Sequence, residues 1–176
     1  MGLVHIYCGD GKGKTSAAVG LAVRAAGCGK RVVIARFLKT DNSGEVELLK
    51  KIPEVTLIPC RKTFGFVRSM DEETKRECAA YHRKLFGEAV KLAEHADLVV
   101  FDEIMAAVNY GMVPERDVLE FLENRPGRDQ TDGLEIVLTG RDPSEKLIAA
   151  ADYVSEICKR KHPFDKGIMA RRGVEY

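Results

Sequence analysis

The sequence lacks the features that mark nucleic-acid-binding proteins and membrane proteins. Its 28 lysines and arginines nearly balance 27 aspartates and glutamates, so the formal net charge is only +1. A general binder of nucleic acid or of an anionic membrane usually carries a clear basic excess. No apolar run reaches the roughly 18 residues that a membrane-spanning helix needs. We therefore expect neither a nucleic-acid partner nor a membrane partner.

Paired cysteines and clustered histidines are also missing. The five cysteines are odd in number and none stand as C-x-x-C, and the four histidines are scattered. This argues against a disulfide framework and against a zinc site, and it fits reduced thiols in a cytoplasmic protein. The first residues, MGLVHIYCGDG, resemble neither a secretion signal nor a myristoylation site. We expect a cytoplasmic location.

What the chain does contain is a regular alternation of apolar, β-branched runs and helical segments over 176 residues. This alternation predicts an α/β fold, with a parallel sheet flanked by helices on both faces. No repeat or linker divides the chain, so we expect one domain over residues 1–176. The expected strands are 3–7, 31–37, 54–59, 98–103, 134–140 and 153–158. The expected helices are 15–27, 45–52, 71–96, 142–151, and 114–125 with Pro114 as its first residue.

A glycine-rich loop follows the first expected strand. The stretch CGDGKGKTSAA nearly matches the phosphate-binding pattern G-x-x-x-x-G-K-[ST], but Cys8 stands where the first glycine belongs. Lys14 is the usual phosphate ligand of such a loop, and Thr15 is the usual metal ligand. The alternative is a glycine-rich turn with solvated lysines, which the position directly after a strand disfavours. The predicted ATP-binding residues are Gly9, Asp10, Gly11, Lys12, Gly13, Lys14, Thr15 and Ser16.

Charged side chains follow two further expected strands. Asp102 and Glu103 resemble the end of a Walker B strand, which holds Mg²⁺ beside the loop threonine; alternatively, they cap the next helix. Arg141 follows the strand at 134–140, on the edge where open α/β sheets bind ligands. There it contacts phosphate, or it forms a surface ion pair with a neighbouring acid.

No serine or cysteine with a matched histidine stands out as a nucleophile. Cys8 adjoins the loop, but a small buried structural thiol explains it better. The residues alone therefore predict an ATP-binding α/β domain with Mg²⁺ (or Mn²⁺). They leave open whether the γ-phosphate is hydrolysed, whether it is transferred, or whether another atom of ATP is attacked.

Several stretches together resemble a known family. They are CGDGKGKTSAA, VVFDE and the tail KHPFDKGIMARRGVEY, with NRPG and LTGRDP between them. In this order they are similar to the P-loop type of ATP:cob(I)alamin (corrinoid) adenosyltransferase over nearly the whole chain. The family's loop reads G-[ND]-G-K-G-K-T, which is the form present here, and generic P-loop ATPases lack the tail. The resemblance implies a P-loop NTPase-like (RecA-like) fold.

The resemblance also implies a reaction. In this family the reduced cobalt of the corrinoid, Co(I), attacks the 5′-carbon of ATP's ribose, and tripolyphosphate leaves whole, in adenosylcobalamin synthesis or salvage. The substrate supplies the nucleophile, so no residue of the chain has to. Lys14 and Arg141 then stabilise the leaving group. Thr15 and Glu103 hold Mg²⁺ (or Mn²⁺), with Asp102 close by.

Two phenylalanines and the tail gain roles from the same resemblance. Phe64 and Phe66 match an F-x-W-like spacing whose aromatics press on the lower face of the corrin, although the chain has no Trp. Without the resemblance they are two core or loop phenylalanines. The family further implies a homodimer and an electron donor such as a reduced flavoprotein. Five tail residues contact substrate or a neighbouring subunit, or else form a solvated surface: His162, Phe164, Asp165, Arg171 and Arg172.

Two other classes of protein share a modified phosphate loop. One is a P-loop ATPase or regulatory protein that binds ATP and assembles a partner. The other is a small nucleoside kinase of the type II thymidine kinase kind, which usually carries a zinc site of cysteines near the C-terminus. Only Cys158 lies late in this chain, which counts against the kinase.

Overall fold

The computed structural model describes residues 2–128 and 132–175. The strands are β1 (Val4–Cys8), β2 (Val32–Arg36), β3 (Val55–Leu57), β4 (Leu98–Asp102), β5 (Glu135–Thr139) and β6 (Tyr153–Glu156). The α-helices are α1 (Lys14–Gly27), α2 (Gly44–Leu49), α3 (Glu72–Ala93), α4 (Ile104–Asn109), α5 (Glu115–Glu123) and α6 (Glu145–Ala149). Two short 3-10 helices are η1 (Val67–Ser69) and η2 (Pro163–Lys166).

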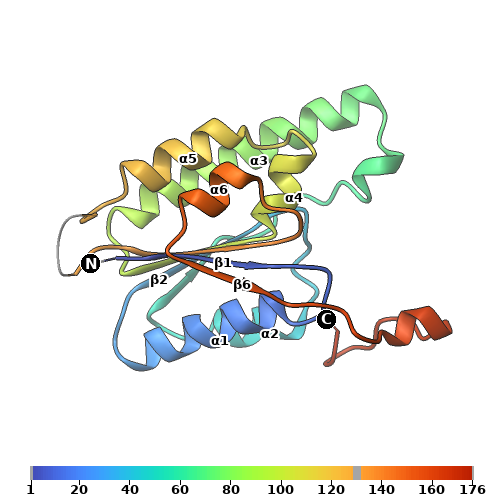
Figure 1. Ribbon diagram of the computed structural model, residues 1–176, viewed down its shortest axis with the longest axis horizontal. Helices are drawn as coiled ribbons and strands as arrows, with labels where there is room; N and C mark the ends of the chain where they lie inside the picture. Colours follow the sequence, from blue (N-terminus) through green and yellow to red (C-terminus); the bar gives the residue numbers. More distant parts are fainter. Residues whose placement is uncertain (1, 129–131, 176) are drawn as a thin grey trace.

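The six strands form one sheet in the order β3-β2-β4-β5-β1-β6, and each pair of neighbours is parallel. Helices α1 and α2 cover one face, and α3, α4, α5 and α6 cover the other (Figure 1). This confirms the predicted α/β architecture, and it is consistent with a P-loop NTPase-like fold. β5 lies between β1, which precedes the glycine loop, and β4, which ends in the carboxylates.

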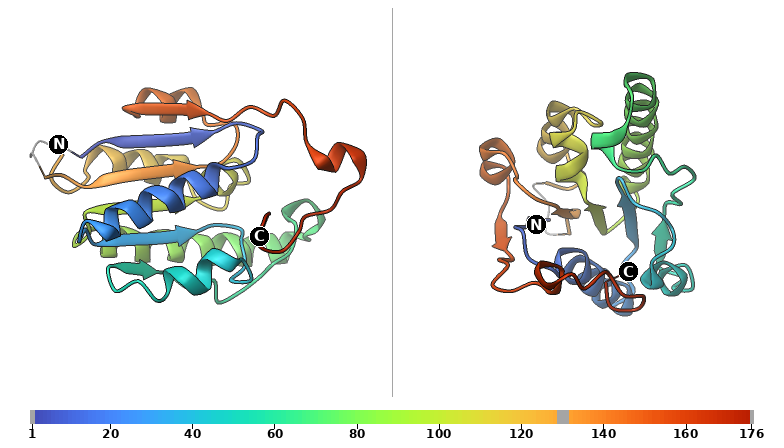
Figure 2. Two further views of the ribbon diagram at one scale, coloured as in Figure 1. Left: turned by 90° about the horizontal axis from the view of Figure 1, so that it is seen from below. Right: turned by 90° about the vertical axis from the view of Figure 1, so that its right-hand side faces the viewer.

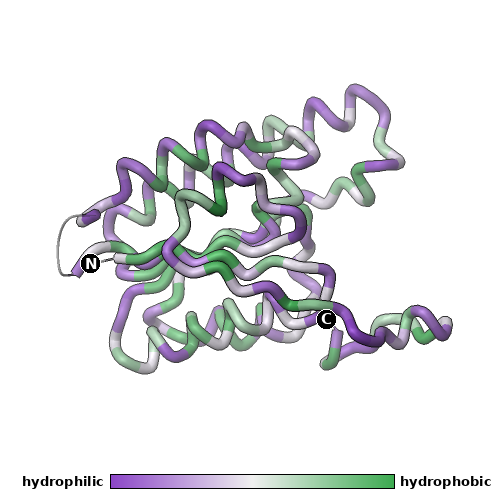
Figure 3. The backbone as a smooth tube through the Cα atoms, viewed as in Figure 1, coloured by the Kyte–Doolittle hydropathy of each residue, from purple (hydrophilic) through white to green (hydrophobic). Residues whose placement is uncertain are grey.

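Burial explains why these segments become strands. Every residue of β2 and β4 is buried, as expected for parallel strands that are covered on both faces. The hydrophobic residues concentrate along the central strands (Figure 3). Phe101 on β4 packs against Phe86 and Phe121, with ring centroids 5.4 and 5.6 Å away. Burial of each such ring contributes about 2–3 kcal/mol. No helix in the described ranges is both long enough and apolar enough to span a bilayer.

The structure departs from the sequence expectations at a few element ends. α5 begins one residue later than predicted, because Pro114 is the extended N-cap residue rather than the first helical residue. α3 ends at Ala93 and not at 96, since His95 and Ala96 form tighter turns with backbone bonds to Leu92 and Ala93. α4 is an additional helix that the pattern does not predict. It has six residues, and no side chain caps its start.

The topology gathers several loops at one edge of the sheet. Since all strands are parallel, their carboxyl ends face the same way, and the loops after β1, β2, β4, β5 and β6 meet there (Figure 2). The tail after β6 turns back along this edge, so that the C-terminus lies far from the N-terminus (Figure 1). This edge is where open α/β sheets bind ligands.

Candidate nucleotide site

The glycine loop between β1 and α1 has a conformation that only glycine adopts easily. Gly9 and Gly13 have φ values of 101° and 117°, in a region that residues with a Cβ rarely enter. A Cβ on Gly9 or Gly11 would lie 2.5 or 2.6 Å from the carbonyl oxygen of Ile157. The Gly11 N–H donates to that same oxygen at 2.7 Å. The segment after β6 therefore rests directly on the loop.

Cys8 belongs to the sheet and not to the loop. It is the last residue of β1, it is buried, and it pairs with Glu156 of β6. Burial raises the pKa of its thiol above the ordinary value, so the thiol stays protonated at neutral pH. The displaced glycine pattern thus reflects a loop that begins at Gly9, one residue later than the common motif.

Lys14 is drawn into the loop. Its Nζ donates to the carbonyl oxygens of Gly9 and Gly11, each at 2.8 Å. The residue is only 8% exposed, and burial lowers the pKa of its ammonium group. Two ammonium protons are satisfied by the loop, which leaves the third for an anionic ligand.

Three hydroxyl and carboxylate groups form a buried network beneath the loop. Asp102, at the end of β4, is 2% exposed. Its Oδ1 accepts from Thr15 Oγ1 at 3.0 Å and from Thr139 Oγ1 at 2.7 Å. Thr139 in turn accepts from the backbone N–H of Glu103 at 2.8 Å. The sequence reasoning missed Thr139, although its position at the end of an expected strand on the ligand edge was a usable signal.

Lys39 completes this network, and the sequence reasoning missed it too. Its Nζ lies 2.7 Å from Thr15 Oγ1 and 2.5 Å from Asp102 Oδ2. The residue follows the strand expected at 31–37 by two positions, so the same ligand-edge argument applies to it. A lysine outside any motif gives no further sign of its role.

Glu103 stands at the N-cap position of α4 with φ 63° and ψ 27°, in the left-handed region. Its side chain makes no capping hydrogen bond. This backbone costs a residue with a Cβ about 1–2 kcal/mol, and such strain concentrates at functional sites. Glu103 shares a pocket with the glycine loop, whereas Asp102 points into the network below.

The pocket has a volume of about 290 Å³. Arg141 lines it and donates to the carbonyl oxygen of Asp10 at 3.4 Å. In the described ranges Arg141 forms no ion pair, so the surface-pair alternative has no support. The pocket is lined by Asp10, Gly11, Lys12, Gly13, Lys14, Thr15, Ser16, Glu103, Arg141, His162, Val174 and Glu175.

The C-terminal tail closes one side of this pocket. Glu175 pairs with Lys12 at 3.2 Å and with Arg171 at 3.1 Å. Hydrogen bonds from Arg171 lower the pKa of Glu175 to about 2. The sequence reasoning named Arg171 but not Glu175.

The other tail residues divide between the pocket and the surface. His162 lines the pocket and accepts a bond from the Phe164 backbone, and Asp165 pairs with Lys159. Phe164 and Arg172 are exposed.

A second cavity of about 870 Å³ adjoins the first. The two share Thr15, Ser16, Val174 and Glu175. The second cavity extends along α1 to Val19 and across to the segment between β2 and α2. Together the two cavities form a continuous surface from the glycine loop past Lys39.

Phe64 and Phe66 do not join the phosphate residues. Phe66 is 87% exposed. Phe64 is half-buried, and its ring lies 5.6 Å from Tyr81 and 6.3 Å from His82 between centroids. Both belong to the irregular segment 60–70, and neither lines the two cavities described above.

The oxygen atoms at the site suit a magnesium ion. Thr15 offers a hydroxyl, and Asp102 and Glu103 offer carboxylates, which are the hard ligands that Mg²⁺ prefers. Within residues 2–128 and 132–175, no three His, Cys, Asp or Glu side chains gather into a metal site by themselves. A P-loop site does not need such a cluster, because phosphates and water supply the remaining ligands.

Comparison with known proteins gives consistent matches over the whole chain. A family model described as ATP:corrinoid adenosyltransferase BtuR/CobO/CobP matches residues 1–176. The corrinoid adenosyltransferase of Escherichia coli K12 is 34% identical over 178 residues, which cover 99% of this chain and 86% of the relative. Corrinoid adenosyltransferase CobA of Salmonella typhimurium LT2 is 35% identical over 176 residues, with the same coverage. The corrinoid adenosyltransferase of Pseudomonas aeruginosa PAO1 is 31% identical over 178 residues, covering 99% of this chain and 84% of the relative.

Proposed function

This chain belongs to the ATP:corrinoid adenosyltransferase family, and on that premise we propose that it transfers the 5′-deoxyadenosyl group of ATP to the Co(I) of a reduced corrinoid. A bond forms between cobalt and C5′, and the bond from C5′ to the α-phosphate oxygen breaks. The electron pair of that bond leaves with intact tripolyphosphate. The observation that carries this proposal is a pocket lined by three cationic side chains, Lys12, Lys14 and Arg141. Among the described residues, no hydroxyl or thiol in this pocket is hydrogen-bonded to a histidine that would activate it as a nucleophile.

The protein's part in this reaction is to position ATP and to stabilise negative charge on the leaving group. Backbone N–H groups of the glycine loop and the start of α1 face the pocket and favour an anion there. Lys14 has one free ammonium proton to offer, and Arg141 is held at the rim by Asp10. The rest of ATP would occupy the second cavity, which is continuous with the first at Thr15 and Ser16.

Mg²⁺ would be held by Thr15, Glu103 and Asp102. When bound, it neutralises charge on the polyphosphate. Thr139 prepares this site, because its hydroxyl holds both Asp102 and the backbone of Glu103 in place. The left-handed backbone of Glu103 turns its carboxylate toward the glycine loop rather than along α4.

The corrinoid contacts and the partners remain proposals. The exposed ring of Phe66 is available to press against a flat ligand, and the ring of Phe64 packs against Tyr81. We also propose a homodimer and an electron donor such as a reduced flavoprotein, which the resemblance to the family implies.

The test is to mix the protein with ATP, Mg²⁺ and chemically reduced Co(I) corrinoid without oxygen, and to follow the visible spectrum. We expect a light-sensitive alkylcobalt product and one intact tripolyphosphate per product. Lys14→Ala should abolish both. Release of ADP or inorganic phosphate without an alkylcobalt product would instead indicate an ATPase or a nucleoside kinase.

A further inference from the structure

Lys39 contacts two of the residues that we propose as metal ligands. Its ammonium nitrogen lies 2.7 Å from Thr15 Oγ1 and 2.5 Å from Asp102 Oδ2, which are two of the oxygen donors proposed for Mg²⁺. The carboxylate of Asp102 is buried, with 3% of its side chain exposed, whereas the Lys39 side chain is 27% exposed. An unpaired carboxylate at that depth would be strongly unfavourable. Lys39 therefore supplies the positive charge that Asp102 requires.

The backbone around Lys39 is built to present it there. Leu38 has a left-handed backbone with φ 52°. The Phe37 N–H donates to the Asp102 carbonyl oxygen at 2.8 Å, and the Phe37 side chain is fully buried. Leu38 therefore has a strained backbone, and Phe37 is fixed against β4.

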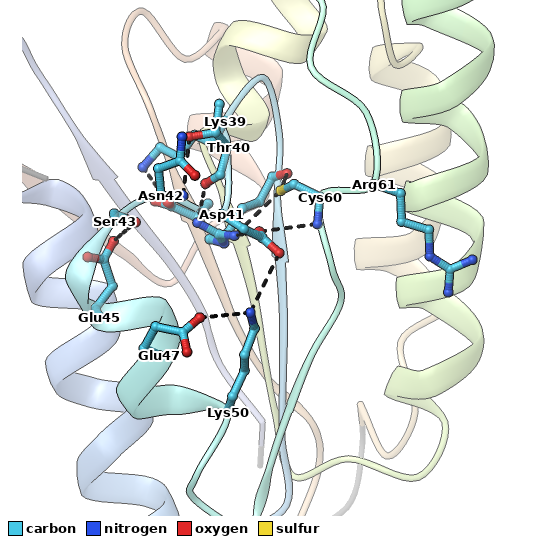
Figure 4. Close-up of polar contacts among 12 residues, drawn as sticks. Lys39, Thr40, Asp41, Asn42, Ser43, Glu45, Glu47, Lys50, Cys60 and Arg61 are labelled. Carbon is cyan, nitrogen blue, oxygen red and sulfur yellow. Dashed lines mark hydrogen bonds and ion pairs between the residues drawn. The ribbon is translucent and has the colours of Figure 1, made fainter.

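A buried ion pair holds the other side of the segment. Arg36 has 1% of its side chain exposed, pairs with Asp41, and donates to the carbonyl oxygen of Thr40 at 2.9 Å. Asp41 also accepts from the Cys60 N–H at 3.2 Å and lies 4.0 Å from Lys50 Nζ (Figure 4). We call the Arg36–Asp41 pair, with its bonds to Thr40 and Cys60, the clamp. It anchors the chain directly after Lys39.

We propose that Lys39 is a tethered cation that competes with the divalent metal for Thr15 and Asp102, and that it moves to the polyphosphate when metal and nucleotide bind. An ammonium ion and a divalent cation cannot share oxygens at these distances, because their repulsion is large near a buried site. The lysine stem is flexible, and its three ammonium protons can reorient. Lys39 lines the second cavity together with Thr15 and Ser16, and this cavity is the proposed path of ATP.

This inference rests on the metal role proposed for Thr15 and Asp102, and the experiment separates the two. Binding of Mn²⁺ alone is measured by electron paramagnetic resonance on the nucleotide-free protein, for wild type, Lys39→Met and Lys39→Arg. Lys51→Met is the matched control, because Lys51 is exposed and has no side-chain hydrogen bond or ion pair in the described ranges. Asp102→Asn tests the metal site itself.

If Lys39 holds the site about nine-tenths of the time, Lys39→Met should bind Mn²⁺ about tenfold more tightly than wild type. Lys39→Arg keeps a competing charge and should stay close to wild type, as should Lys51→Met. In a second titration, with inorganic tripolyphosphate and Mg²⁺, Lys39→Met should bind tripolyphosphate several-fold more weakly, since one phosphate contact is lost.

Unchanged or weaker Mn²⁺ binding by a folded Lys39→Met protein overturns the inference. If Lys39→Met does not fold, a tenfold tightening in Lys39→Arg would also overturn it, because arginine retains the charge. Two results would overturn the proposed metal site and the inference with it. One is that Asp102→Asn binds Mn²⁺ as tightly as wild type. The other is that no variant binds Mn²⁺, even when tripolyphosphate is present.

Discussion

Glu103 joins two properties in one residue: a carboxylate that faces the phosphate pocket and a backbone in the left-handed region. Glycine adopts this backbone without penalty, and alanine does not. We therefore expect Glu103→Gly to be more stable than Glu103→Ala by about 1 kcal/mol, measured by urea unfolding. Both variants should lose most of their adenosyltransferase activity, because both lack the carboxylate. Equal stability of the two would show that the left-handed backbone carries no strain.

The clamp formed by Arg36 and Asp41 leads to a second prediction about single residues. Removing Asp41 leaves the guanidinium of Arg36 buried without a counter-ion, and breaking a buried pair in this way costs about 3–5 kcal/mol. Asp41→Ala should therefore lose about that much unfolding free energy. Glu77→Ala breaks the exposed pair with Lys62 and should lose less than about 1 kcal/mol. Similar losses in the two variants would contradict the structural importance of the clamp.

At the scale of elements, α3 carries a buried histidine among aromatic rings. His82 is 3% exposed, and its ring lies 5.1 Å from Tyr81 and 5.9 Å from Phe37 between centroids. Burial lowers its pKa to about 4, from an ordinary value of about 6.5. Between these two values the unfolded chain binds a proton that the folded chain does not. Stability contributed by neutral His82 is therefore complete above about pH 6.5 and falls as the pH drops toward 4.

The variant His82→Phe should flatten this dependence. The wild-type curve of unfolding free energy should fall more steeply than that of the variant between pH 6.5 and pH 4, by up to about 1.4 kcal/mol per pH unit. His95→Phe, at an exposed histidine just after the same helix, should keep the wild-type slope. Parallel curves for wild type and His82→Phe would show that His82 is not the group responsible.

The strands β2, β4 and β5 were predictable from sequence because parallel strands covered on both faces are nearly continuous apolar runs. β4, with the sequence LVVFD, is fully buried. α4 was not predictable, since it is short and its N-cap residue, Glu103, makes no capping side-chain bond. Its N-cap residue is held by a bond from the Glu103 backbone N–H to the side-chain hydroxyl of Thr139 on β5. Contacts between segments 36 residues apart leave no local pattern.

The residues of the candidate site also divide into those that the sequence predicts and those that it does not. The glycine loop is a contiguous motif, so its eight residues could be named from sequence, and the structure brings seven of them into one pocket. Lys39 and Glu175 belong to the site through contacts with residues that are distant in the chain. The family resemblance was confirmed over the full chain. The roles of Phe64 and Phe66 stay a prediction.

At the scale of the whole molecule, the C-terminal tail folds back onto the glycine loop, where Glu175 pairs with Lys12. The carboxylate of Glu175, whose pKa is lowered to about 2, is charged at neutral pH and lies beside Lys12. Glu175 therefore competes with polyphosphate for the ammonium group of Lys12. We expect Glu175→Gln to bind tripolyphosphate several-fold more tightly, by calorimetry at low salt, with a smaller difference at high salt. Weaker binding would show that this carboxylate supports the loop instead.

The position of the two chain ends decides how the enzyme can be handled. Gly2 lies beside Leu134 at the opposite end of the sheet from the phosphate loop. Val174 and Glu175, by contrast, line both cavities. An affinity tag, a fusion partner or a surface linker should therefore be attached at the amino end. The same attachment at the carboxyl end would place foreign residues beside the two cavities that we propose as the nucleotide site.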